Sequence, residues 1–398
     1  MVESTRIQIE ASKRLTPTQE LSIVRAAFAR SPSDLMRERL AGLLVAADAF
    51  EEIIELLAGI PERSFPEEMM LAHAYFARET SQDTQRAATA ADRALQIAAT
   101  DKARAAALAT LAKAQTRQGQ TGRARATLAE ALELDPGNKD ACKRITALEL
   151  AYGLPETLLA HMDNLAAKGV AHSQLFAACA LAHAKSGDLA AAREAVGLKH
   201  LHCSRNLPPP PGWTSIRDFN SALTEELLAH PALRYERYGT ASEHTWRIDA
   251  PATGEAPHLR CLLDRLSSAI ERHLDRIAAI DHPWVRARPE KALLRSWCVI
   301  TESDGYESWH CHHSGWLSGV YYVRVPQVIS KGSGPAGCLG FGLPPELAGE
   351  EAAQRLGTAL VRPREGLMHA FPSHAYHRTF AHGSGGKRIC LAFDLRPL

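Results

Sequence analysis

The hydrophobic pattern divides the chain into two parts. Between residues 16 and 197, apolar residues recur every three to four positions among Ala, Leu, Glu and Arg, as on one face of successive helices. After residue 292, short apolar stretches alternate with Gly and Pro, which indicates strands joined by turns. We therefore predict a multidomain α+β chain in which an all-helical region precedes an antiparallel sandwich or barrel of the jelly-roll kind. The expected strands are Leu293–Ile300, Leu317–Val325, Gly337–Phe341, Gly366–Phe371 and Arg388–Leu395, and two expected helices precede them at Ser215–His230 and His258–Ala279.

Three glycines in the helical region, Gly119, Gly153 and Gly187, lie 34 residues apart. This is the period of tetratricopeptide (TPR) repeats, in which each repeat is a helix–turn–helix. The copy around Gly119 resembles the repeat pattern most closely, whereas the copy around Gly153 is degenerate but keeps the length. A generic helical bundle is the alternative, although a bundle does not explain the period. We predict a TPR-like solenoid, whose concave surface would suit a peptide or protein partner.

Four consecutive prolines, Pro208–Pro211, interrupt the helical pattern. Prolines favour a stiff, extended segment, so this stretch is the predicted domain boundary. The expected organisation is a TPR-like domain over residues 1–200, a proline-rich linker over 201–214 and a second domain over 215–398.

Composition excludes several classes of partner. The net charge is +1 and no Lys/Arg block is present, which argues against a nucleic-acid partner. No apolar stretch approaches the roughly 18 residues of a membrane helix, and the N-terminus lacks the pattern of a signal peptide. The eight cysteines form no Cys-x-x-Cys pair, so a zinc ribbon and a secreted disulfide framework are disfavoured, and we expect a reducing cytoplasm. The oligomeric state stays open.

Candidate chemistry begins with three histidines in four positions, His310, His312 and His313, directly ahead of an expected strand. In an extended chain, His310 and His312 point to one face, while Cys311 and His313 point to the other. Two imidazoles on one face form half of a metal site. Imidazole suits Fe(II), whose oxygenase sites keep positions open for a co-substrate and O₂.

The missing half of the site is expected downstream. His377 is preferred over His374 because it stands eleven residues before Arg388, a span that suits a short loop between adjacent strands. The face that begins with Arg388 continues with the small residues Cys390 and Ala392, which leaves space for a ligand carboxylate beside the guanidinium.

Some alternatives stay open at the metal. A common oxygenase site combines two histidines with one carboxylate, but His312 stands where the Asp or Glu would be. Either three histidines bind the iron, or His312 lies nearby and water completes the coordination. A zinc site that includes Cys311 is the competing hypothesis, which strand alternation disfavours.

Residues from about 206 onward resemble the bacterial 2-oxoglutarate/Fe(II) oxygenases that often follow TPR repeats. The resemblance implies a double-stranded β-helix and the oxidative decarboxylation of 2-oxoglutarate to succinate and CO₂. It implies that His310, His312 and His377 bind iron and that Arg388 binds the distal carboxylate of 2-oxoglutarate, with Ser318 and Tyr322 as further hydrogen-bonding candidates. The blocks that carry the resemblance are Pro210-Pro211-Gly212-Trp213, Asp218-Phe219-Asn220, His310-x-His312, Leu317–Val323, Phe371-Pro372-Ser373 with His377, and Arg388–Phe393.

Together, these features predict an Fe(II)- and 2-oxoglutarate-dependent dioxygenase that uses O₂ to hydroxylate a C–H bond. The expected substrate is a peptide- or protein-borne or amino-acid-like group, recognised through the TPR-like groove. One alternative is a three-histidine Fe(II) dioxygenase that does not use 2-oxoglutarate, in which Arg388 would bind a carboxylate of the substrate itself. Another is a TPR adaptor whose barrel binds a ligand without turnover.

Overall fold

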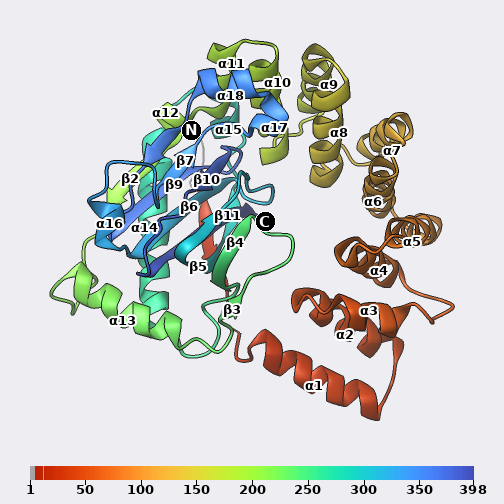
Figure 1. Ribbon diagram of the computed structural model, residues 1–398, viewed down its shortest axis with the longest axis horizontal. Helices are drawn as coiled ribbons and strands as arrows, with labels where there is room; N and C mark the ends of the chain where they lie inside the picture. The colour runs from red at the N-terminus through yellow and green to blue at the C-terminus, as the bar shows by residue number, and fades with distance from the viewer. Residues whose placement is uncertain (1–4, 12) are drawn as a thin grey trace. The chain divides into compact units, whose positions relative to one another are not determined.

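The computed structural model describes residues 5–11 and 13–398. Contacts divide the chain into two compact units. The first, called the helical unit below, comprises residues 15–157 and 163–170; the second, called the sheet unit, comprises the described residues up to 14 together with 158–162 and 171–398. The predicted fold class is confirmed, because an all-α region precedes an antiparallel sheet domain (Figure 1).

The helical unit is built from consecutive helices, and up to residue 152 the chain neighbours pack on each other. Its helices are α1 (Pro17–Arg30), α2 (Asp34–Ala46), α3 (Phe50–Leu57), α4 (Phe65–Arg78), α5 (Asp83–Ile97), α6 (Asp101–Arg117), α7 (Thr121–Leu134), α8 (Lys139–Tyr152) and α9 (Pro155–Ala167). Gly119 joins α6 to α7 with a φ of 73°, a left-handed conformation that glycine adopts without strain. Gly153 ends α8 in an extended conformation instead, where a Cβ atom would collide with the side chains of Glu149 and Arg125.

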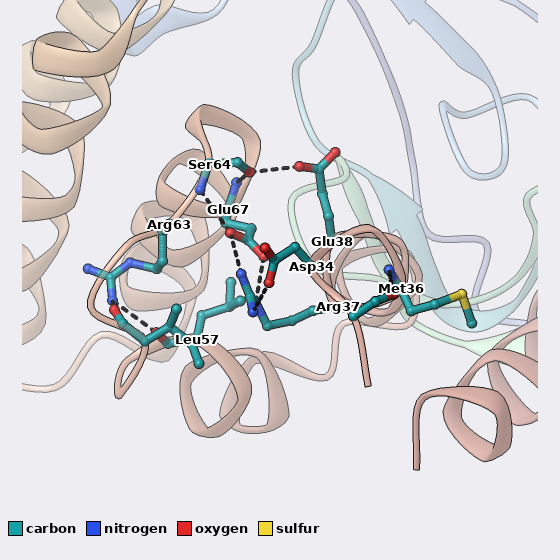
Figure 2. A network of polar contacts seen from close by, with 10 residues as sticks. Asp34, Met36, Arg37, Glu38, Leu57, Arg63, Ser64 and Glu67 are labelled. Atoms are coloured by element: carbon teal, nitrogen blue, oxygen red, sulfur yellow. Dashed lines mark hydrogen bonds and ion pairs between the residues drawn. The ribbon is translucent and has the colours of Figure 1, made fainter. Parts of the chain in front are cut away.

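A buried ionic network holds α2 against α4 (Figure 2). Arg37 on α2 donates from Nε to Glu67 Oε1 on α4 at 2.7 Å and also contacts Asp34 at 2.9 Å. Ser64 starts α4 through a capping box in which its side chain and that of Glu67 bind each other's backbone amides. Ser64 also donates to Glu38 at 2.7 Å. The network therefore fixes both the start of α4 and its packing partner.

The sheet unit contains two antiparallel sheets, as expected for a double-stranded β-helix. The large sheet has the order β2-β9-β6-β11-β5-β4-β3, with β1 added in parallel to β5, and the small sheet has the order β10-β7-β8. All five predicted strands are present, within two or three residues at most ends apart from a longer β5. The strands are β1 (Arg6–Ile9), β2 (Cys203–Asn206), β3 (Arg234–Tyr235), β4 (Ser242–Ile248), β5 (Lys291–Glu307), β6 (Leu317–Arg324), β7 (Leu339–Phe341), β8 (Ala359–Val361), β9 (Leu367–Pro372), β10 (His377–Thr379) and β11 (Arg388–Pro397).

The helices of the sheet unit include the two that were predicted, α13 and α14. α13 packs on β6, where Tyr321 donates a 2.8 Å hydrogen bond from its hydroxyl to Asn220 Oδ1 on α13. α14 contacts α13 and β1 and buries nine side chains, which accounts for its strong amphipathic pattern. The helices are α10 (Ser173–Lys185), α11 (Leu189–Val196), α12 (Leu198–Leu201), α13 (Ile216–Leu228), α14 (Pro257–Ile277), α15 (Pro283–Arg286), α16 (Gln327–Ser330), α17 (Pro345–Ala348) and α18 (Glu350–Leu356).

The sheet unit begins earlier in the chain than the predicted boundary at residue 200. Gly187 joins α10 to α11 as the period predicts, yet both helices belong to the sheet unit, where they contact α18. The proline-rich segment is not a free linker, because β2, directly before it, pairs with β9. β1 likewise joins the large sheet from the start of the chain. Short strands that complete a distant sheet edge carry no local signal that separates them from loops.

Among the described residues, no helix combines the length and the apolarity that crossing a bilayer requires.

Candidate metal centre and adjoining cavity

Three histidines meet at one end of the small sheet. His310 and His312 lie in the loop between β5 and β6, and His377 is the first residue of β10. A two-residue bridge aligns His310 with His377, since each backbone N–H donates to the carbonyl of the other at 3.0 and 2.9 Å. One ligand atom from each of the three side chains lies within 4.8 Å of the other two. The three histidines that the sequence nominated are therefore the three that the fold brings together.

Hydrogen bonds at Nδ1 orient each of the three rings. His310 Nδ1 lies 2.8 Å from the carbonyl oxygen of Ser308, and His377 Nδ1 lies 2.9 Å from that of Ala375. His312 Nδ1 lies 2.6 Å from Asp394 Oδ1. An oxygen acceptor at Nδ1 holds the proton there and leaves Nε2 with its lone pair, the arrangement in which an imidazole binds a metal.

Asp394 is the main site residue that the sequence interpretation missed. It is 2% exposed on β11, and its carboxylate accepts from Ser318 Oγ at 2.8 Å as well as from His312. Burial pushes the pKa of Asp394 upward, but the charge of His312 and the hydrogen bonds from His312 and Ser318 outweigh it, so the pKa lies below its usual value. The signal was present in the strand pattern, because Asp394 continues the alternating face that begins at Arg388.

The structure gives Ser318 a different position from the one predicted. Its hydroxyl is fully buried and lies 2.9 Å from His312 Nδ1 and 2.7 Å from Ser373 Oγ, in addition to its bond to Asp394. Ser318 therefore contacts His312 at Nδ1 and helps to orient its ring, instead of facing the co-substrate. Gly315 passes so close to this group that a Cβ atom would lie 3.2 Å from Asp394 and collide with Ser373.

Burial favours the neutral forms of His310 and His377, the forms that bind a metal. Desolvation lowers the pKa of His377 well below its usual value, and the neighbouring His310 and His312 lower it further. Desolvation also lowers the pKa of His310, although the nearby Glu307 carboxylate opposes the shift.

Arg388 lies on the wall of a small cavity that also contacts His312 and His377. The arginine is 2% exposed, and its Nη1 donates to the carbonyl of Gly337 at 3.1 Å. Its Nε is buried and has no partner, and the described residues place no carboxylate in an ion pair with it. A buried guanidinium that forms no ion pair is costly, so a ligand carboxylate fits this position.

The cavity has the lining that strand alternation predicts. Cys390 and Ala392 line it from β11, and Tyr322 lines it from β6 with its ring centroid 5.9 Å from the Arg388 guanidinium carbon. Lys387 faces elsewhere, paired with Glu302. The loop after β10 crosses from the small sheet to the large one, whereas the sequence suggested a link between adjacent strands.

The cavity is small and contains an acidic residue that was not predicted. Its volume is about 30 Å³, which is room for one or two water molecules. Glu307, at the end of β5, lines it and accepts from Ser242 Oγ at 3.1 Å. Burial raises the pKa of Glu307, but His310, Arg247 and Arg388 outweigh that effect and hold it below its usual value. Co-substrate entry therefore requires side chains in the lining to move.

His374 and Cys311 lie outside the group of three histidines. His374 points its Nε2 toward the carbonyls of Ala195 and Val196, at 3.1 and 3.2 Å. Cys311 lies 3.5 Å from the side-chain amide of Gln174 and is not part of the histidine group. The described residues therefore support a three-histidine site over a cysteine-containing zinc site. Within the described residues, the eight cysteines form no disulfide bond.

Comparison with a protein family supports the oxygenase resemblance. Residues 295–394 match the family model described as "Putative 2OG-Fe(II) oxygenase". The matched segment contains the three histidines, Arg388 and, as its last residue, Asp394. The match confirms the resemblance over this segment. A comparison with curated proteins finds none that matches the chain.

Solved structures are similar to parts of the chain. A Pseudomonas putida prolyl-4-hydroxylase is 18% identical, with 56% of this chain and 99% of that chain covered and a TM-score of 0.33. A Trichoplax adhaerens prolyl hydroxylase, solved with a peptide fragment of a hypoxia inducible factor, is 12% identical over 49% of this chain and 83% of that chain, with a TM-score of 0.34. PilW, a type IV pilus biogenesis factor, is 18% identical over 46% of this chain and 83% of that chain, with a TM-score of 0.37. At this level, the likeness concerns the shape of parts of the chain.

Proposed function

We propose that this protein is an Fe(II)- and 2-oxoglutarate-dependent dioxygenase that hydroxylates a C–H bond of a peptide- or protein-borne or amino-acid-like substrate. The observation that carries the proposal is the convergence of three oriented histidines beside a buried arginine that forms no ion pair in the described residues. The family match over residues 295–394 supports the same reaction class.

Each site residue has a defined task in this proposal. His310, His312 and His377 hold the iron, and Asp394 fixes the orientation of His312. Arg388 binds the far carboxylate of 2-oxoglutarate, with Tyr322 beside it. Bound iron and 2-oxoglutarate would supply O₂ activation coupled to the release of succinate and CO₂. Burial of the site excludes water from this chemistry.

We assign substrate recognition to the TPR-like repeats. Stacked helical hairpins form extended surfaces that suit peptides or proteins, which is why a macromolecular substrate is favoured over a free metabolite. We also retain the cytoplasm as the predicted compartment on the basis of the sequence. Both assignments are open to direct measurement.

The decisive experiment is a turnover measurement on the full chain. Purified protein loaded with Fe(II) without oxygen should bind 2-oxoglutarate and, once air is admitted, release succinate slowly even without a prime substrate. Arg388→Ala should abolish succinate release while leaving iron in place. If the wild-type protein binds iron but never forms succinate, even with a library of peptides, the proposal fails.

One observation favours a second candidate, a three-histidine dioxygenase that does not use 2-oxoglutarate. The cavity beside Arg388 holds about 30 Å³ and includes the Glu307 carboxylate, both unfavourable for a dicarboxylate. In this alternative, Arg388 binds a carboxylate of the substrate itself. Iron-loaded protein that consumes oxygen with a peptide substrate in the absence of 2-oxoglutarate would favour it. A protein that binds ligands with no oxygen consumption would be a non-catalytic adaptor.

A further inference from the structure

The sheet unit contains a second, much larger pocket that the proposed chemistry does not use. It has a volume of about 640 Å³ and is bounded by α11, α12, β7, β8 and β9. Its deeper wall is apolar and includes Val196, Leu198 and Phe341. Its exposed rim carries Arg193 and Lys199. A pocket of this size with few polar groups is typical of a site for a small organic molecule.

His369 on β9 is an unsatisfied polar group in the wall of this pocket. Its side chain is 2% exposed, and neither ring nitrogen has a hydrogen-bond partner in the described structure. Burial lowers its pKa to about 3, so the ring is neutral and presents one donor and one acceptor. Leaving a buried donor and a buried acceptor without partners is unfavourable, and a polar group of a ligand would relieve that penalty.

The large pocket continues into a basic compartment. A neighbouring hollow of about 430 Å³ shares His202, Val361 and His369 with it. This hollow is lined by Arg362 and Arg364, and no acidic residue lines it. Arg362 donates to the backbone carbonyls of Ile329 and Gly334, which leaves its charge without a counter-ion. The two compartments form one groove, apolar at one end and cationic at the other, with His369 where they meet.

Two aromatic rings separate this groove from the candidate iron site. The Phe341 centroid lies 5.5 Å from that of His369 and 5.9 Å from that of His377. The Phe371 centroid lies 5.8 Å from that of His369 and 4.8 Å from that of His377. The groove is therefore distinct from the Arg388 cavity and one side-chain layer away from it.

We propose that this groove binds a small amphiphilic acid, with its hydrocarbon part between α11–α12 and β7–β8 and its anionic group beside Arg362 and Arg364. Charge complementarity selects the acid, because the rim and the basic compartment carry four cationic side chains, Arg193, Lys199, Arg362 and Arg364, against one acidic side chain, Glu194. A polar atom near the junction binds His369.

A small molecule fits this groove better than a peptide does. A peptide brings a backbone N–H and a carbonyl with nearly every residue, and each needs a partner once buried. The deeper wall of the large pocket offers a single unpaired polar side chain, His369. A hydrocarbon with one acidic end makes no such demand.

The test measures binding on the full-length protein without iron or 2-oxoglutarate, so that its outcome does not depend on the proposed reaction. Anilinonaphthalene sulfonate serves as the fluorescent probe, and decanoate, decanol and decylamine compete for the groove. Decanoate should displace the dye best and decylamine worst. Arg388→Ala should leave this displacement unchanged, which separates the groove from the iron cavity.

Two variants test the residues. His369→Phe keeps the size of the ring and removes both nitrogens, so decanoate should bind roughly ten- to a hundredfold more weakly while the melting temperature holds or rises. His369→Gln restores a donor and an acceptor and should recover part of the affinity. Ala359→Trp, at an exposed position that lines the pocket, should block the dye.

The proposal is overturned by unchanged dye binding in both Ala359→Trp and His369→Phe. It is also overturned if decanol competes as well as decanoate, since the cationic compartment would then have no role. Displacement by acidic, leucine-containing octapeptides but not by decanoate would identify a peptide site instead.

Discussion

The helical unit and the sheet unit differ in whether their buried polar side chains have partners. In the helical unit, the buried acids Glu67, Glu68 and Asp83 have arginine partners at 2.7, 2.9 and 2.7 Å. In the sheet unit, Arg388 is buried without an ion pair among the described residues, although the Glu307 carboxylate lines the same cavity, and His369 is buried with both nitrogens unpaired. Some single atoms lack partners in the helical unit too, such as Arg63 Nε, but the charge of that arginine is balanced by Glu68.

The difference distinguishes buried polar groups that stabilise the fold from buried polar groups that are available to a ligand. A paired buried charge contributes to the choice of packing partner, because a wrong neighbour would leave it uncompensated. A buried donor or acceptor without a partner lowers the stability of the free protein. A stable fold can tolerate this cost where a bound ligand supplies the missing partner. We therefore expect substitutions in the two units to produce different kinds of loss.

The largest expected effect is the loss of iron. His310→Ala and His377→Ala should each remove most of the roughly one Fe(II) bound per chain, because each deletes one of three ligands. His313→Ala is the matched control, since it changes a neighbouring histidine outside the group. Metal analysis after anaerobic loading and gel filtration measures the result. Full retention in both ligand variants would show that the three histidines do not form a metal site.

Breaking the buried pair in the helical unit should cost stability instead of ligand binding. Glu67→Ala leaves Arg37 without its main partner and disrupts the capping box, so we expect a loss of about 3–5 kcal/mol. The control is Glu52→Ala, whose partner Arg25 is half exposed and whose pair should contribute about 0–1 kcal/mol.

The two units can be followed separately during this measurement. All six tryptophans lie in the sheet unit, so their fluorescence reports that unit, whereas far-UV circular dichroism reports mainly the helices. Urea unfolding of Glu67→Ala should shift the dichroism transition and leave iron binding intact. Equal losses in Glu67→Ala and Glu52→Ala would contradict the assigned difference between buried and exposed pairs.

Binding of 2-oxoglutarate should respond next. Arg388→Ala is expected to weaken it by about 2–4 kcal/mol, the scale for losing one partner of a desolvated charge pair, without loss of iron. Isothermal titration of 2-oxoglutarate into iron-loaded protein under nitrogen measures the change. Arg378→Ala is a suitable control, because that arginine stacks on Trp309 and Phe380 and does not line the cavity. An unchanged affinity in Arg388→Ala would mean that the arginine has been misassigned.

A smaller effect on metal affinity is expected from Asp394, which contacts the candidate ligand His312. Asp394→Asn keeps the shape of the side chain but weakens its hold on His312 Nδ1, which should reduce metal affinity about 10- to 100-fold. Competition with a colorimetric chelator measures the affinity. Arg396→Gln is the control, since its contact with Asp394 is 3.5 Å long and lies away from the histidines. If Asp394→Asn binds iron normally, the orientation of His312 depends on Ser318 alone.

Local patterns predicted much of the fold and the site. The 34-residue period located the ends of α6, α8 and α10, and strand alternation placed Cys390 and Ala392 in the cavity beside Arg388. Spacing favoured His377 over His374, and the group contains His377, although the loop that the spacing assumed joins two different sheets. These features depend on neighbours in the chain, which a single sequence displays.

Long-range pairing limited what the sequence could reveal. β1 and β2 are four residues each and exist only because β5 and β9 offer them backbone partners from far along the chain. Their absence from the prediction explains why the proline segment was taken for a boundary. The role of Ser318 required knowledge that Ser373 and Asp394 approach it, and that contact comes from three separate strands or strand ends.

The last and smallest effect is a slope of stability with pH. Burial lowers the pKa of His369 to about 3, and that of His374 to about 3 as well. An unfolded imidazole titrates near 6.5, so above that pH neither state is protonated and the stability is fully present. As the pH falls from about 6.5 toward 3, the unfolded state takes up a proton that the folded state refuses, and each histidine lowers the unfolding free energy by about 1.4 kcal/mol per unit.

Substitution of one of these histidines should flatten that slope. In His369→Phe the dependence should decrease by about one proton between roughly pH 6 and pH 5, because the variant has no group there to protonate in either state. Urea unfolding followed by tryptophan fluorescence measures the slope in the sheet unit. His200→Phe is the control, since it makes the same substitution at an exposed histidine. An identical slope in wild type and His369→Phe would mean that folded His369 takes up a proton in the same pH range as the unfolded imidazole. The buried His369 ring would then be charged, with water beside it.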